Sequence, residues 1–197
     1  MASSFITVVS GLPRSGTSLV MQMLAAGGMA VLADGIRASD DDNPAGYLEF
    51  EPVKRTRSDS SWVPSAAGKA VKVIYLLLMD LPLTFSYRVI FMRRGLDEVV
   101  SSQQTMLQRR GEPGAGLDAA AMSRVFQQQL EKVEAWLSKQ PSFLVMFLNY
   151  RDVVSEPQIQ AERIREFLGV DLDTSAMSAA VNPKLYRHRA DDEASSK

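Results

Sequence analysis

The 197-residue sequence contains no cysteine, which excludes disulfide bonds, thiolate metal sites and cysteine nucleophiles. It also lacks a surplus of either charge, because 22 lysines and arginines stand against 23 aspartates and glutamates and the formal net charge is -1. No global positive field therefore attracts nucleic acid or an anionic membrane, and any anion site has to be built locally. We expect no nucleic-acid partner and, from the missing cysteine, a cytoplasmic protein.

Long apolar runs are missing as well. The best one, residues 73–83, contains Asp80 and Pro82 and falls short of the roughly 18 apolar residues that cross a bilayer, so no membrane partner is expected. The N-terminus lacks the basic region of a signal peptide. The length fits one domain, which we place at residues 1–190, with a disordered tail at 191–197.

Apolar segments alternate with amphipathic ones along the chain. Strands are expected at residues 5–9, 29–32, 70–74, 88–92 and 143–148, and helices at 17–26, 96–109, 117–139 and 157–168. Parallel strands need a crossover connection, which is usually a helix. The alternation therefore predicts an α/β fold, with helices on both faces of a mainly parallel central sheet.

The most informative motif is GLPRSGTS at residues 11–18, between the first expected strand and the first expected helix. Its glycines let backbone N–H groups point at a ligand, and the helix N-terminus adds partial positive charge, so the segment predicts a phosphate cradle. The spacing is that of a Walker A motif, but Thr17 stands at the lysine position and the cation is Arg14, inside the loop. This difference disfavours an ordinary ATPase or kinase.

A second basic turn follows the expected 88–92 strand. Arg93 stands at the carboxyl end of that strand, where open α/β sheets bind ligands, and Ser101 lies two helical turns further on. We predict that Arg93 and Ser101 together bind one phosphate. A solvated ion-pair cluster at the start of the helix, formed by Arg93, Arg94, Asp97 and Glu98, is the alternative interpretation.

Together the two elements resemble the sulfotransferase family that uses 3'-phosphoadenosine 5'-phosphosulfate (PAPS) as donor. Its members carry a Gly-x-Pro-Arg/Lys-Ser-Gly-Thr-Ser/Thr loop for the 5'-phosphosulfate and an Arg-x-Pro-x-Asp-x-x-x-Ser element for the 3'-phosphate. The stretch NPAGYLE at residues 43–49 is similar to bacterial members, whereas Gly95 replaces the usual proline of the second element. The resemblance implies a P-loop NTPase-like three-layer α/β/α fold. It also implies these donor-binding residues: Pro13, Arg14, Ser15, Gly16, Thr17, Ser18, Arg93 and Ser101.

The activity that the resemblance implies is transfer of a sulfuryl group from PAPS to a hydroxyl or amine of a small or medium-sized acceptor. The product is 3'-phosphoadenosine 5'-phosphate (PAP), and no metal is required. Such a transfer needs cations for the developing charge and a base for the acceptor's proton. We assign Arg14 to the leaving side, and Lys72 to the sulfuryl group because it resembles the strand lysine of cytosolic members. An ordinary strand-end lysine is the alternative.

The base of the cytosolic enzymes is missing, because the position of their histidine is Ile74. Asp34 lies 20 residues after Arg14, a spacing similar to that of the catalytic carboxylate in tyrosylprotein sulfotransferases. We predict Asp34 as the base, with Arg37 positioning it or binding the acceptor and Glu49 as the reserve base. A turn-capping Asp34 is the alternative.

Trp62 is a candidate for the acceptor-binding surface, although a core position is the more common place for tryptophan. Two other functions stay open. A kinase-like phosphotransferase would share the fold, but it should have lysine at position 17 and an acidic magnesium ligand. A non-catalytic nucleotide-binding module would keep the donor loop without a base. The sequence leaves the acceptor and the oligomeric state undetermined.

Overall fold

The computed structural model describes residues 5–36, 46–111 and 118–182. The expected tail at 191–197 lies outside these residues. The strands are β1 (Ile6–Gly11), β2 (Ala70–Lys72), β3 (Tyr87–Arg93) and β4 (Phe143–Asn149). The helices are α1 (Thr17–Ala26), α2 (Leu96–Arg110), α3 (Ala119–Leu137), α4 (Tyr150–Ser155), α5 (Pro157–Leu168) and α6 (Thr174–Ala179). Three 3₁₀ helices precede β3, namely η1 (Glu51–Arg55), η2 (Val63–Ala66) and η3 (Tyr75–Asp80).

The four strands form one parallel sheet in the order β2-β1-β3-β4. In the register, Gly11 of β1 lies beside Met92 of β3, and Val9 lies beside Lys72 of β2. The carboxyl ends of β1, β2 and β3 therefore meet at one edge of the sheet, where open α/β folds bind their ligands. The expected α/β fold with a parallel sheet is confirmed.

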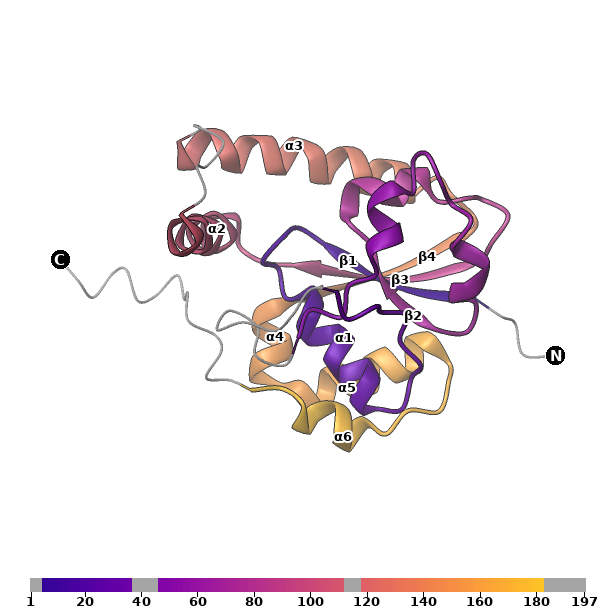
Figure 1. The fold of residues 1–197 in the computed structure, drawn as a ribbon. Coiled ribbons are helices and arrows are strands. Elements are labelled where there is room, and N and C mark those ends of the chain that lie inside the picture. The colour runs from indigo at the N-terminus through magenta and orange to yellow at the C-terminus, as the bar shows by residue number, and fades with distance from the viewer. Residues whose placement is uncertain (1–4, 37–45, 112–117, 183–197) are drawn as a thin grey trace.

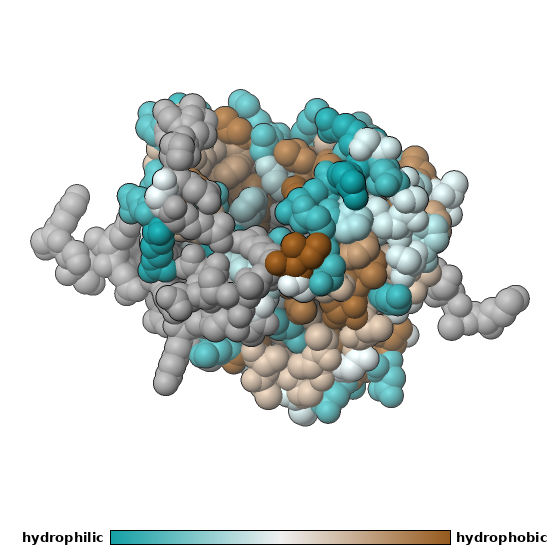
Figure 2. All heavy atoms as spheres, viewed as in Figure 1, coloured by the Kyte–Doolittle hydropathy of each residue, from teal (hydrophilic) through white to brown (hydrophobic). Residues whose placement is uncertain are grey.

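Helices cover both faces of the sheet, which gives three layers (Figure 1). Strand β1 shows why its apolar run is continuous, since Val8 packs into one core and Val9 into the other. The first core includes Val99 of α2 and Val133 of α3. The second core is formed with α1, α4, α5 and α6. On the molecular face drawn in Figure 2, hydrophilic and hydrophobic side chains are interspersed.

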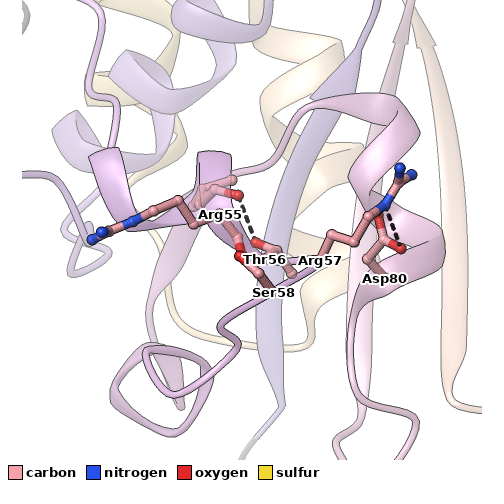
Figure 3. Close-up of polar contacts among 6 residues, drawn as sticks. Arg55, Thr56, Arg57, Ser58 and Asp80 are labelled. Atoms are coloured by element: carbon pink, nitrogen blue, oxygen red, sulfur yellow. Dashed lines mark hydrogen bonds and ion pairs between the residues drawn. The ribbon is translucent and has the colours of Figure 1, made fainter.

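Between α1 and β2, the described residues form 3₁₀ helices and loops rather than α-helices or full strands. The strand expected at 29–32 forms only a single bridge, between Val31 and Ala70. After η1, Ser58 donates to the carbonyl of Arg55, and Arg57 reaches Asp80 of η3, 23 residues further along the chain, at 3.4 Å (Figure 3). Among the described residues, no helix is both long and apolar enough to cross a membrane.

Candidate functional site

A cavity of about 590 Å³ opens at the carboxyl edge of the sheet. It lies between the loop after β1, the first turns of α1, the 47–54 segment, the end of β2 and one side of α2. Its described lining contains one acidic residue, Glu49, and five cationic residues: Arg14, Lys54, Lys72, Arg94 and Arg109. A chain with a net charge of -1 thus concentrates positive charge in one place. This local excess gives the cavity the electrostatics of an anion site.

The loop between β1 and α1 requires glycine at both of its ends. Gly11 has φ 147° and Gly16 has φ 97°, a region that side chains disfavour. A Cβ atom on Gly16 would lie 2.4 Å from a ring carbon of Tyr150, and one on Gly11 would lie 2.6 Å from the carbonyl of Met92. Ser15 closes the loop, because its amide and its hydroxyl both donate to the carbonyl of Leu12, at 3.2 and 2.7 Å.

The N-terminus of α1 has no side-chain cap. Gly16 is its N-cap residue, and Thr17 and Ser18 of its first turn line the cavity. The first amides of an α-helix have no partner within the helix, and they carry the positive end of the helix dipole. Together with the cationic lining, this helix end is suited to an anionic ligand.

Arg94 is built into the wall of the cavity beside this loop. Its side chain is only 8% exposed and pairs with Glu98 at 2.8 Å. One of its terminal nitrogens donates to the carbonyl of Arg14 at 3.1 Å, and its guanidinium lies over the ring of Tyr150, 4.5 Å from the centroid. Arg14 in turn donates from Nε to the hydroxyl of Ser102 at 3.0 Å. These contacts bring together a loop arginine, a strand-end arginine and a serine of α2.

The predicted pair Arg93 and Ser101 does not lie in this cavity. Arg93 is 44% exposed, pairs with Glu134 of α3 at 2.6 Å and stacks on Phe147 at 3.9 Å. It faces a separate, smaller cavity of about 310 Å³. Side chains alternate in direction at the end of a strand, so Arg93 turns to α3 and the next residue turns to the loop. Arg94 and Ser102, one residue later in each case, line the larger cavity instead.

Arg94 and Ser102 were not among the residues predicted for the site, although the sequence contains a pattern that includes them. Arg94, Glu98 and Ser102 have the same spacing as Arg93, Asp97 and Ser101. The sequence therefore contains two overlapping copies of one pattern, shifted by a single residue.

Lys72 and Glu49 form the second polar centre of the cavity. Lys72 Nζ lies 3.1 Å from Glu49 Oε1, and it donates to the Ser18 hydroxyl at 3.1 Å and to the Tyr47 carbonyl at 2.9 Å. The side chains of Lys72 and Glu49 are 14% and 20% exposed. The predicted Lys72 is thus brought next to the predicted Ser18 and the reserve base Glu49.

Asp34 is not part of the cavity lining, and its side chain binds backbone amides instead. Its carboxylate accepts hydrogen bonds from the amides of Glu51, at 2.5 Å, and Ile36, at 3.0 Å. The bond from Glu51, followed by the bond from Ile36, lowers the pKa of Asp34. This is the geometry of a turn-capping aspartate, the alternative interpretation of this residue. Its predicted partner Arg37 lies outside the described residues.

Trp62 belongs to the core rather than to the cavity wall. It is 7% exposed, its indole N–H donates to Thr56 Oγ1 at 3.2 Å, and it meets the ring of Phe50 edge-on at 6.1 Å. Phe50 itself lines the cavity. Trp62 therefore supports an aromatic wall residue from behind, which is the core position that is the more common one for tryptophan.

Part of the chain matches a known family in sequence. Residues 86–174 match the profile of a family described as the Sulfotransferase family. No curated protein sequence matches the chain significantly. The sulfotransferase domain of the curacin biosynthetic pathway is 12% identical with a TM-score of 0.55, over 97% of this chain and 95% of that one.

Two further solved structures have a similar fold. The sulfotransferase domain of the Synechococcus PCC 7002 olefin synthase is 14% identical with a TM-score of 0.51, over 93% of this chain and 82% of that one. Mouse sulfotransferase SULT7A1, solved in complex with PAP, is 19% identical with a TM-score of 0.56, over 92% of this chain and 63% of that one. The expected P-loop NTPase-like arrangement is confirmed: this chain has the fold of the sulfotransferases, and its residues 86–174 match that family in sequence.

Proposed function

We propose that this protein is a PAPS-dependent sulfotransferase that acts on a hydroxyl or amine of an acceptor molecule. The observation that carries the proposal is the convergence of Arg14, Arg94 and Ser102 at the uncapped N-terminus of α1. PAPS carries two separate anionic groups, the 5'-phosphosulfate and the 3'-phosphate. The cavity offers the loop of Arg14 for the 5'-phosphosulfate, and Arg94 with Ser102 beside it for the 3'-phosphate.

The donor-binding residues follow from this arrangement. The loop residues 13–18, with the first amides of α1, bind the 5'-phosphosulfate. Arg94 and Ser102 bind the 3'-phosphate, in place of the Arg93 and Ser101 expected from the sequence. The buried pairing of Arg94 with Glu98 and its stacking on Tyr150 support this assignment, because they hold a planar fork of donors in one orientation.

The acceptor's proton is taken by Glu49. Its carboxylate lines the cavity and pairs with Lys72 at 3.1 Å, which holds it within reach of a molecule bound in the cavity. When bound, PAPS supplies the sulfuryl group and leaves as PAP. Arg14 and Lys72 stabilise the negative charge that develops on the donor and on the transferred group.

A binding experiment tests the donor assignment. We expect calorimetry to show that PAP binds about 10- to 100-fold more tightly than 5'-AMP, because one charge-assisted hydrogen-bonded group contributes roughly 1.5–3 kcal/mol. Equal affinity for PAP and 5'-AMP would contradict the assignment of a 3'-phosphate site. A preference for ATP with magnesium would instead support a kinase-like phosphotransferase.

A turnover experiment separates an enzyme from a binding module. PAP released from PAPS is measured with and without a mixture of phenols, alcohols and amines as acceptors. Acceptor-dependent PAP release supports the proposal. Tight PAP binding without any release would assign the chain as a non-catalytic nucleotide-binding module.

A further inference from the structure

Strand β4 forms one edge of the sheet, and within the described part of the chain its outer backbone groups have no hydrogen-bond partner. The amide of Tyr87 donates to the carbonyl of Ser142 at 2.8 Å, and the parallel register then runs from Tyr87–Phe143 to Arg93–Asn149. In such a ladder alternate residues bond to the neighbouring strand, so the amides and carbonyls of Val145 and Phe147 face outward. Among the described residues, neither has a backbone hydrogen bond beyond this edge.

The side chains of β4 are apolar on both faces of the sheet. Val145 packs against the core under α3, and Met146 packs against the core on the opposite face. Leu144 is 58% exposed and Phe147 is 37% exposed. A strand with apolar residues on both faces is typical of the interior of a parallel sheet rather than of its edge.

The residues of β4 itself provide none of the usual protections, and the nearest charge is the Arg93 guanidinium stacked on Phe147. Exposed edge strands normally carry a charge, a proline or a bulge, which prevent pairing with another strand. The sequence of β4, FLVMFLN, contains no charged residue and no proline, and its register with β3 is uninterrupted. The edge is therefore suited to pair with a further strand.

We propose that a second copy of this chain pairs antiparallel with β4 across a two-fold axis. Under two-fold symmetry the partner strand is β4 itself and has the same length. Because β4 contains no charged residue, pairing with its own copy places no like charges opposite each other within the two strands. The pairing joins two four-stranded sheets and covers Leu144 on one face and Phe147 on the other. Within the given sequence, the segments outside the described residues contain no apolar run of strand length that would serve instead; these segments are 1–4, 37–45, 112–117 and 183–197.

The dimer does not depend on the proposed function. In an antiparallel pairing the carboxyl edges of the two sheets point in opposite directions, so each cavity is built from one chain. Variants at the edge are therefore expected to lose the dimer and keep PAP binding, and the two proposals can fail separately.

The test is the molar mass in solution, measured by light scattering over a concentration series. We expect the wild type to have twice the chain mass of 21.7 kDa. Val145→Pro removes an outward N–H without touching the bonds to β3, and Leu144→Lys places a charge at the edge. Both variants should have the mass of one chain. Ile36→Lys is the matched control, since Ile36 is 70% exposed and follows the segment beside β2, at the other side of the sheet.

Two results would overturn the proposal: a wild type that stays monomeric, and a dimer that persists in both edge variants. If the variants do not fold, hydrogen exchange of the wild-type amides still tests the pairing. Slow exchange at the amides of Val145 and Phe147 in a dimer supports the pairing. Fast exchange there contradicts it, and slow exchange in a monomer would show that another segment of the same chain covers the edge.

Discussion

Asp34 and Glu49 are close in sequence, but the structure gives them opposite environments. The carboxylate of Asp34 is occupied by two backbone amides, whereas that of Glu49 faces Lys72 inside the cavity. A general base has to reach the proton that it accepts, so geometry favours Glu49. The spacing from Arg14 predicted a carboxylate near the donor loop. It could not show that backbone amides bind the Asp34 carboxylate and leave that of Glu49 in the cavity.

This difference predicts the kinetics of two variants. Glu49→Gln should lower the turnover of PAPS by about 10²- to 10⁴-fold, the usual contribution of a general base, while PAP affinity stays within a few-fold of the wild type. Asp34→Asn is the matched control and should keep most of its turnover. Turnover and PAP binding are measured on the same samples. Loss of activity in Asp34→Asn together with normal turnover in Glu49→Gln would reverse the assignment.

The lowered pKa of Asp34 makes a separate prediction about stability. A carboxyl group whose pKa is lower in the folded than in the unfolded chain stabilises the fold above its unfolded value of about 3.9. This contribution is lost as the pH falls through the folded value. The wild type should therefore melt above Asp34→Asn near neutral pH, and the two curves should converge in strong acid. A difference in melting temperature that persists unchanged in acid would contradict this.

The two adjacent arginines show the limit of motif spacing. Arg93 and Arg94 each have an acidic residue four positions on and a serine eight positions on, so the pattern fits both. Only the direction in which β3 ends distinguishes them, and it sends Arg93 to Glu134 and Arg94 to the loop. That direction depends on packing against α3 and α4, which a local pattern does not contain.

At the scale of elements, the loop between β1 and α1 provides a matched pair of glycine variants. Gly16 and Gly28 have similar positive φ values, 97° and 92°, but only a Cβ on Gly16 would meet Tyr150. Gly28→Ala should cost about 1–2 kcal/mol of unfolding free energy from backbone strain. Gly16→Ala should cost more, and it alone should weaken PAP binding. Denaturant unfolding and calorimetry measure the two effects, and equal losses in both variants would rule out a special role for the Gly16–Tyr150 contact.

Elements with a continuous local pattern were predicted closely from the sequence. Helix α1 has the bounds expected for residues 17–26, and β4 extends the expected 143–148 by one residue. The strand expected at 29–32 was reduced to one bridge, because β2 is only three residues long and offers little edge to pair with. The burial of Trp62 likewise depends on tertiary packing, which decides which ring of the 50–62 segment faces the cavity.

For the whole molecule, composition predicted that an anion site would have to be local, and the cationic cavity agrees. This separation of charge predicts a strong effect of salt. PAP affinity should fall several-fold as ionic strength rises from about 0.05 to 0.5 M, because screening weakens its contacts with the cationic lining. Adenosine, which has no phosphate, is the control and should bind equally at both salt concentrations. Salt-independent binding of PAP would contradict an electrostatic site.

If the cavity beside Arg94 binds the donor, the affinity for PAP should depend on Arg94 and not on Arg93. PAP is titrated by calorimetry into the wild type, Arg94→Ala and Arg93→Ala, with melting temperatures to show that each variant is folded. We expect Arg94→Ala to weaken PAP binding by about 10-fold or more, and Arg93→Ala to keep a PAP affinity within about two-fold of the wild type. Normal affinity in Arg94→Ala, or a loss confined to Arg93→Ala, would contradict it.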